Sequence, residues 1–153
     1  MLTQESLKIQ YHLLEFETCG CLEFLDCTDR FEELLQNSGI HAGFMSLQSK
    51  HTTAALLINE NEPLLLSDMK RTLERLAPQQ ETYLHNDFSI RTVNMQDQED
   101  RNGHSHCKAI FLPTSQVLNI VENRLDLGKW QRIFLLELDQ AKRRTVSVTI
   151  LGS

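Results

Sequence analysis

Histidines border the most polar segments of this 153-residue chain. His51 precedes an apolar run that ends in an acid and amide corner at residues 59–62, and His85 opens a polar segment that closes on His104 and His106. A catalytic zinc site uses three protein ligands and keeps one open position, and histidine nitrogen is a common ligand. In an extended backbone His104 and His106 point to one face. The sequence therefore predicts a divalent metal site, and zinc is the ion that we expect.

Four acidic residues are candidates for orienting these histidines or for moving a proton near a metal-bound water. They are Glu60, Asp68, Glu99 and Asp100. We expect Glu60 or Asp68 to be the catalytic group, because both belong to the acid-rich stretch that follows His51. The alternative is structural, since Asp68 can pair with Arg71 along a helix surface.

Other chemistry is weakly supported. Cys19, Cys21 and Cys27 match no common zinc spacing. Cys107 follows His106, but strand neighbours point to opposite faces, which argues against a nucleophile and base pair. The basic pairs 70–71 and 143–144 lie outside any glycine-rich loop, so we expect solvated charges there. No nucleotide-binding motif is present.

The composition is that of an ordinary globular protein, with 41% hydrophobic and 24% charged residues. We expect one domain over residues 1–153. The net charge of −6 argues against nucleic acid, which normally binds to basic surfaces. No signal peptide and no apolar run long enough to cross a membrane are evident, so we expect a cytoplasmic protein with reduced cysteines and no membrane partner.

Hydrophobic periodicity predicts the elements that must position these side chains. Leu7, Ile9, Tyr11 and Leu13 alternate with polar residues, which predicts a strand whose apolar face is buried and whose polar face carries His12. Helical spacing predicts two main helices, one that ends at Gly39 and one over residues 63–77. Further strands are predicted over residues 40–57, 107–112, 116–121, 130–138 and 145–151. The class is α+β, with a largely antiparallel β-sandwich or barrel-like sheet.

Several motifs in this order are similar to those of one known family. They are HTTAALLINENEP with the downstream Asp68, the Tyr83-x-His85 pair, NGHSHCKAIFLPTS, and LDLGKWQRIFLLELD followed by a basic strand. Together they resemble the YjbQ-like family, often labelled secondary thiamine-phosphate synthase. The resemblance extends from about Gly39 to Gly152.

This resemblance implies an α+β sandwich that assembles as a homotrimer, with sites near the subunit boundaries and a metal on the family's histidines. His51, His85 and His106 match those histidines, and His104 matches a position that varies. Residues Glu60, Asn61 and Asp68 match the acid and amide positions. The segment between His85 and His106 is longer here than in many relatives.

Two functions follow as expectations. The first is a metal-binding enzyme of thiamine-phosphate-synthase type that acts on a small, phosphorylated molecule. The alternative is a trimeric module that binds a small anion or metabolite in the same pocket without turnover. A third reading makes the histidines part of a trimer interface.

Overall fold

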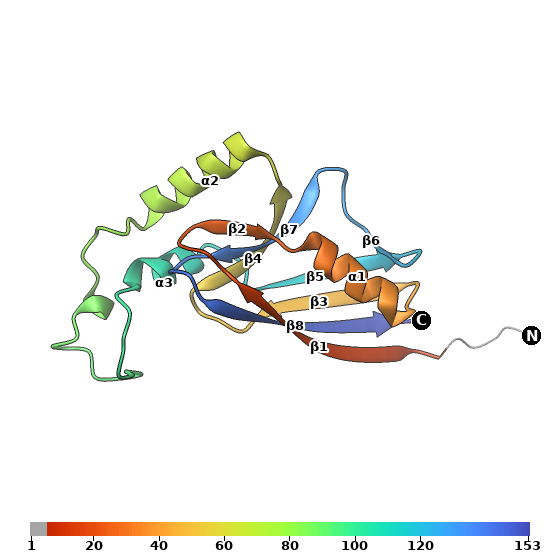
Figure 1. Cartoon of the computed structure of the whole chain (residues 1–153), viewed down its shortest axis with the longest axis horizontal. Coiled ribbons are helices and arrows are strands. Elements are labelled where there is room, and N and C mark those ends of the chain that lie inside the picture. The colour runs from red at the N-terminus through yellow and green to blue at the C-terminus, as the bar shows by residue number, and fades with distance from the viewer. Residues whose placement is uncertain (1–5) are drawn as a thin grey trace, which may run out of the picture.

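The fold is built from two antiparallel sheets. The computed structural model describes residues 6–153. The five-stranded sheet has the order β1 (Lys8–Glu17), β8 (Arg143–Gly152), β3 (Gly43–Ser49), β5 (Ser115–Val121), β6 (Arg124–Leu125). The three-stranded sheet has the order β2 (Glu23–Asp26), β7 (Gln131–Glu137), β4 (Ala54–Glu60), and the two sheets lie over each other (Figure 1). The predicted α+β class with a largely antiparallel sandwich is confirmed.

The main core lies between the two sheets. Alternate residues of β8, from Val146 to Ile150, point inward and meet Ile133 and Leu135 of β7. Helix α1 (Thr28–Ser38) closes one end of this core with Phe31 and Leu35, which are fully buried. The helix ends at Gly39, whose φ of 66° is the left-handed conformation that a helix stop favours.

Two helices cover the outer side of the three-stranded sheet. Helix α2 (Pro63–Leu76) begins with Pro63, and the Glu62 carboxylate caps its first turn by accepting from the backbone N–H of Leu64 and Leu65 at 2.9 and 2.8 Å. Helix α3 (Gly103–Ala109) packs beside the end of α2, and a short 3₁₀ turn, η1 (Leu84–Asn86), lies in the segment between them. These elements form the left end of the molecule in Figure 1.

Two predicted elements differ from the structure. The single strand expected over residues 40–57 is two strands, because the chain crosses from one sheet to the other between Ser49 and Ala54. Residues 107–112, expected as a strand, instead hold the end of α3 and a turn. The structure therefore has a third helix that the apolar run did not predict.

The predicted faces of β1 are reversed. Ile9, Tyr11 and Leu13 are 70, 60 and 51% exposed, whereas His12 and Phe16 lie on the inward face. Among residues 6–153, no helix covers the outer face of the five-stranded sheet, to which these exposed apolar residues belong (Figure 1). Among residues 6–153, no helix is long and apolar enough to span a membrane.

Candidate functional site

His85 and His106 come together at the end of the sandwich. Their ring centroids are 4.7 Å apart, with the planes at 63°. His85 belongs to η1 and His106 to α3, so the pair joins the long polar segment to the helical layer. The Nε2 atom of His85 is buried, and within residues 6–153 it has no hydrogen-bond partner. Burying a polar atom without a partner is energetically unfavourable. The histidine pair is therefore a place where a bound ligand or ion could supply the missing interaction.

Close packing of η1 on α3 holds this pair in place. The backbone N–H of Gly103 donates to Asn86 Oδ1 at 2.9 Å. A Cβ added at Gly103 would lie 2.5 Å from the Cβ of Tyr83, so only glycine allows this contact. A hollow of about 620 Å³ lies beside η1, lined by Tyr83, Asn86, Asp87, Phe88 and Arg101 among others.

His104 does not share a face with His106. The two residues lie in a helix, where side chains two positions apart do not face each other. His104 is 2% exposed and packs near Tyr83, with ring centroids 6.4 Å apart. Burial lowers the pKa of His104, and the Lys108 cation lowers it further. The extended backbone predicted for His104 and His106 is wrong, and the two side chains do not point to one face.

His51 is engaged elsewhere. Its Nε2 accepts a hydrogen bond from the backbone N–H of Thr145 at 2.7 Å. A neutral imidazole that accepts at Nε2 carries its proton on Nδ1, so no lone pair remains for a metal. Burial, and then the charge of Arg144, lower the pKa of His51 and keep it neutral. His51 is therefore bonded to β8 beside the charged group of Arg144 and Glu137, which we call the wall of the site, and among residues 6–153 it forms no metal-binding group with His85 and His106.

A buried ion pair organises this wall. Arg144, 3% exposed, donates from Nε to Oε2 of Glu137 at 2.6 Å and from Nη2 to Oε1. Nη2 also donates to Thr53 Oγ1 at 3.0 Å. The Glu137 carboxylate, fully buried, accepts further hydrogen bonds from Thr18 Oγ1 and the Asp139 backbone N–H, both at 2.9 Å. Both carboxylate oxygens of Glu137, and Nε and Nη2 of Arg144, are thus hydrogen-bonded.

A second charged group, built around Asp139 and Lys142, adjoins the Arg144–Glu137 pair. Asp139 accepts from Lys142 Nζ at 2.6 Å and from Asn102 Nδ2 at 2.9 Å. Lys142 Nζ also donates to Asp100 Oδ2 at 2.6 Å. Burial alone would raise the pKa of Asp139, but the hydrogen bonds from Asn102 and Lys142 lower it. Asp139 is therefore ionised beside His106, whose pKa burial and the neighbouring His85 both lower.

The predicted acids lie elsewhere. Glu60 ends β4, six residues beyond Ala54 and so about 20 Å from the end of the strand near His51. Asp68 pairs with Arg71 on the exposed side of α2. This ion pair is the alternative to a catalytic role that the sequence offers for Asp68. Glu99 pairs with Arg91 at 3.1 Å inside the polar segment. Within one chain, neither Glu60 nor Asp68 is brought to the histidines.

The residues can hold an ion only in part. In the described part of the chain, no three histidine, cysteine or acidic side chains converge closely enough to bind one metal. Of the expected set His51, His85 and His106, one chain brings together His85 and His106. Both fit a metal in their chemistry, since His85 Nε2 lacks a partner and the lowered pKa of His106 favours a free lone pair.

Four charged residues of the wall were not predicted as site residues: Glu137, Asp139, Lys142 and Arg144. Arg144 was expected to be solvated with Arg143, but it continues the inward row of Val146 and Val148. That period of two is visible in the sequence and could have identified Arg144 as a buried charge.

A family model described as UPF0047 protein YjbQ-like matches residues 12–153. The chain belongs to the YjbQ-like family. The resemblance of its motifs is thereby confirmed over nearly the whole chain.

YjbQ-like relatives are close in both sequence and structure. UPF0047 proteins of Methanothermobacter thermautotrophicus and Archaeoglobus fulgidus are 36% and 35% identical, over 91% and 90% of this chain and 90% and 98% of their own. The crystal structure of a YbjQ-like protein of unknown function from Sulfolobus solfataricus has a TM-score of 0.85 at 32% identity, covering 97% of this chain and all of that one. A hypothetical protein from Aeropyrum pernix has a TM-score of 0.82 at 31% identity, covering 94% and 99%.

Proposed function

We propose that this protein is a metal-dependent enzyme that acts on a small phosphorylated molecule at the end of the sandwich. A divalent ion, zinc in this proposal, is held by His85 and His106, and ligand oxygens and water complete its coordination. The observation that carries the proposal is the buried Nε2 of His85, which has no hydrogen-bond partner among residues 6–153, in a ring whose centre lies 4.7 Å from that of His106. A bound ion would polarise a phosphoryl oxygen of the ligand.

The charges near the pair favour a cation. The connected groups contain three carboxylates, Glu137, Asp139 and Asp100, against two cations, Lys142 and Arg144. Both cations are already paired with carboxylates, so neither is free to hold an anion directly. A positive ion would offset the remaining negative charge.

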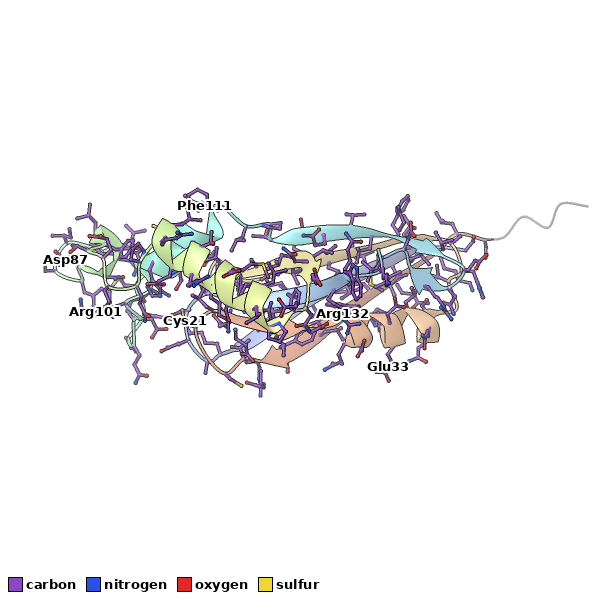
Figure 2. All side chains as sticks on the ribbon, turned by 90° about the horizontal axis from the view of Figure 1, so that it is seen from above. Cys21, Glu33, Asp87, Arg101, Phe111 and Arg132 are labelled. Carbon is purple, nitrogen blue, oxygen red and sulfur yellow. The ribbon has the colours of Figure 1, made fainter. Side chains whose placement is uncertain are left out.

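Arg101 supports a phosphorylated ligand. Its guanidinium lies 5.0 Å from the centre of the Phe88 ring in the hollow beside η1, and Nη1 donates to Asn86 O at 3.0 Å. Figure 2 shows Arg101 at the same end of the molecule as Asp87. A guanidinium has five N–H donors, and those left over suit a phosphate.

Proton handling falls to Asp139 and Lys142 in this proposal. Both are charged residues that lie near His106, as is Arg91, which is paired with Glu99, whereas Glu60 and Asp68 lie elsewhere. The reaction that we would test first is the thiamine-phosphate-synthase type implied by the family, which joins a hydroxymethylpyrimidine diphosphate to a thiazole phosphate. We also place the protein in the cytoplasm, where its four free cysteines stay reduced.

Self-association completes the proposal. The outer face of the five-stranded sheet aligns Tyr11, Thr149, Ser46 and Val117 in one cross-strand row, with Ile9 and Phe44 in the next. Val117 is 67% and Phe44 52% exposed. A large exposed apolar surface usually marks an interaction site, so we propose that copies meet here in a homotrimer.

Metal content of the purified protein tests the enzyme proposal. We expect one zinc per chain, lost in His85→Ala and in His106→Ala but kept in His41→Ala, whose histidine is exposed. Because the pKa of His106 is lowered, protonation of this residue should displace zinc only at a lower pH than protonation of an ordinary histidine would. Absence of zinc from the wild-type protein after zinc loading would refute the proposal.

Ligand binding and turnover separate the two candidate functions. We expect Arg101→Ala to weaken binding of inorganic pyrophosphate by about tenfold and to leave the zinc content unchanged. Binding of pyrophosphate with no transfer between the two substrates would favour the non-catalytic module in the same hollow.

A further inference from the structure

Helix α2 leaves most of its apolar face unburied. Its spacing predicts a face packed against the sheet, yet among its residues only Leu73 is buried. Leu65 and Met69 are half-buried, and Leu76 is 50% exposed. The helix lies along the outer side of the three-stranded sheet in Figure 1. Protein interiors are normally close-packed, so this gap needs an explanation.

The two ends of α2 are held firmly. Glu62 caps its first turn, and the fully buried Lys108 of α3 donates to the carbonyl of Ala77 at 2.7 Å and to Glu74 at 3.0 Å. A cation at a helix C-terminus is also favoured by the helix dipole. These contacts fix the helix in place over the sheet and keep the space beneath it open.

The space beneath α2 is an apolar groove of about 340 Å³. This size lies within the range of small-molecule pockets, about 300–1,000 Å³. Its walls are almost entirely apolar and come from the helix, the three-stranded sheet and the turn after α3: Leu65, Met69, Leu73, Phe24, Leu57, Leu136 and Leu112.

The groove opens into a second, charged hollow. Asp68 and Thr72 line both, and the second has a volume of about 780 Å³. In the second hollow Asp68 pairs with Arg71, and Glu74 is bonded to Lys108 and to a backbone N–H.

Arg75 is the remaining charge of that hollow. Throughout residues 6–153 it has no ion-pair partner, although it lines the hollow. An apolar groove that meets an unpaired cation is suited to a molecule with an apolar body and an anionic head.

We propose that this groove binds an amphipathic anion, whose apolar chain or ring lies between α2 and the sheet and whose carboxylate or phosphate head contacts Arg75. The ligand fills the space that the helix leaves, and it buries Leu65 and Met69 as the amphipathic pattern requires. This binding site is separate from the histidine pair and does not depend on the proposed enzyme function.

Decanoate and 1-decanol, titrated by calorimetry against the full-length protein, test this site. We expect saturable binding of one decanoate per chain. Met69→Trp fills the groove and should weaken binding of both probes by about tenfold or more. Arg75→Gln should weaken decanoate binding about threefold to fivefold and leave decanol binding unchanged, since only the charged head contacts the arginine.

Matched variants keep the test specific. Lys70→Gln removes a charge from the same helix outside both hollows, and Val93→Ser removes an exposed apolar residue from the polar segment between η1 and α3, so both should bind decanoate normally. Circular dichroism checks folding, and Leu57→Phe replaces Met69→Trp if that variant unfolds. No saturable decanoate binding, or equal loss in Val93→Ser, would overturn the proposal. Decanoate that binds only as the assembly dissociates would overturn it too, because a second copy would then occupy the groove.

Discussion

Arg144 is a cation that the fold buries almost completely. The desolvation of its guanidinium is offset by two hydrogen bonds to Glu137 and by the Thr53 hydroxyl. Buried ion pairs of this kind contribute little net stability, but a charge left alone in the interior is very unfavourable. The pair therefore stabilises one specific arrangement of the β7–β8 connection beside the histidines.

Replacing Arg144 alone should destabilise the protein strongly. We expect Arg144→Met to lower the free energy of unfolding by about 3–5 kcal/mol, because the Glu137 carboxylate is left buried without its partner. Urea unfolding followed by circular dichroism measures the loss.

The adjacent arginine provides the control. Arg143 is exposed and pairs with Glu17 on the surface, so Arg143→Met should leave the urea midpoint unchanged. The double variant Arg144→Met with Glu137→Met should recover much of the lost stability. An Arg144→Met protein as stable as wild type would show that the pair is not needed.

Prediction from sequence succeeded at the scale of single elements where local signals agree. Pro63 begins α2 and Gly39 ends α1 as predicted. The proline ring fixes φ at a value that suits the first turn of a helix, and glycine adopts the left-handed conformation that ends one. The strands β1 and β8 also alternate in burial along the chain with a period of two, although the faces of β1 are the reverse of those predicted.

Helix α3 was missed because its stability comes from outside the segment. It has seven residues, too few to be stable alone, and its side chains bond to distant strands and helices. Ser105 Oγ donates to Leu138 O at 2.6 Å, and Lys108 Nζ donates to Ala77 O. No local pattern contains this information, so the face and the partners of His104 and His106 could not be predicted.

The contact between α3 and η1 depends on one glycine. We expect Gly103→Ala to lower the free energy of unfolding by about 1–3 kcal/mol, because the new methyl group overlaps Tyr83 and pushes η1 away. It should also separate His85 from His106 and weaken zinc binding. Gly20→Ala is the matched control, since a Cβ there meets nothing within 4 Å. Normal stability and zinc binding in Gly103→Ala would contradict this account of the contact.

At the scale of the whole molecule, the alternation of apolar and polar residues along β1 was predicted correctly, but the side of the sheet that the apolar residues occupy was not. A period of two shows that one face is apolar, and it does not say whether that face meets the core or another chain. The structure places Ile9, Tyr11 and Leu13 outside. The same limit explains the site, since three histidines were recognised as candidates but only the fold reveals that two of them meet.

A charge on the outer sheet face should break the assembly. We expect wild-type protein to sediment as a trimer and Tyr11→Glu to sediment as a monomer, because a buried unpaired carboxylate is unfavourable at an interface. Val93→Glu, at another exposed apolar residue, should remain a trimer. A monomeric wild type, or dissociation of both variants, would contradict the proposed interface.

The central claim is that His85 and His106 bind one ion, and an anomalous difference map at the zinc edge tests it most directly. For crystals grown with zinc, we predict one strong peak about 2.0–2.1 Å from Nε2 of His85 and from a ring nitrogen of His106. A map with no peak between these two rings, or with its strongest peak at His51, would contradict the account.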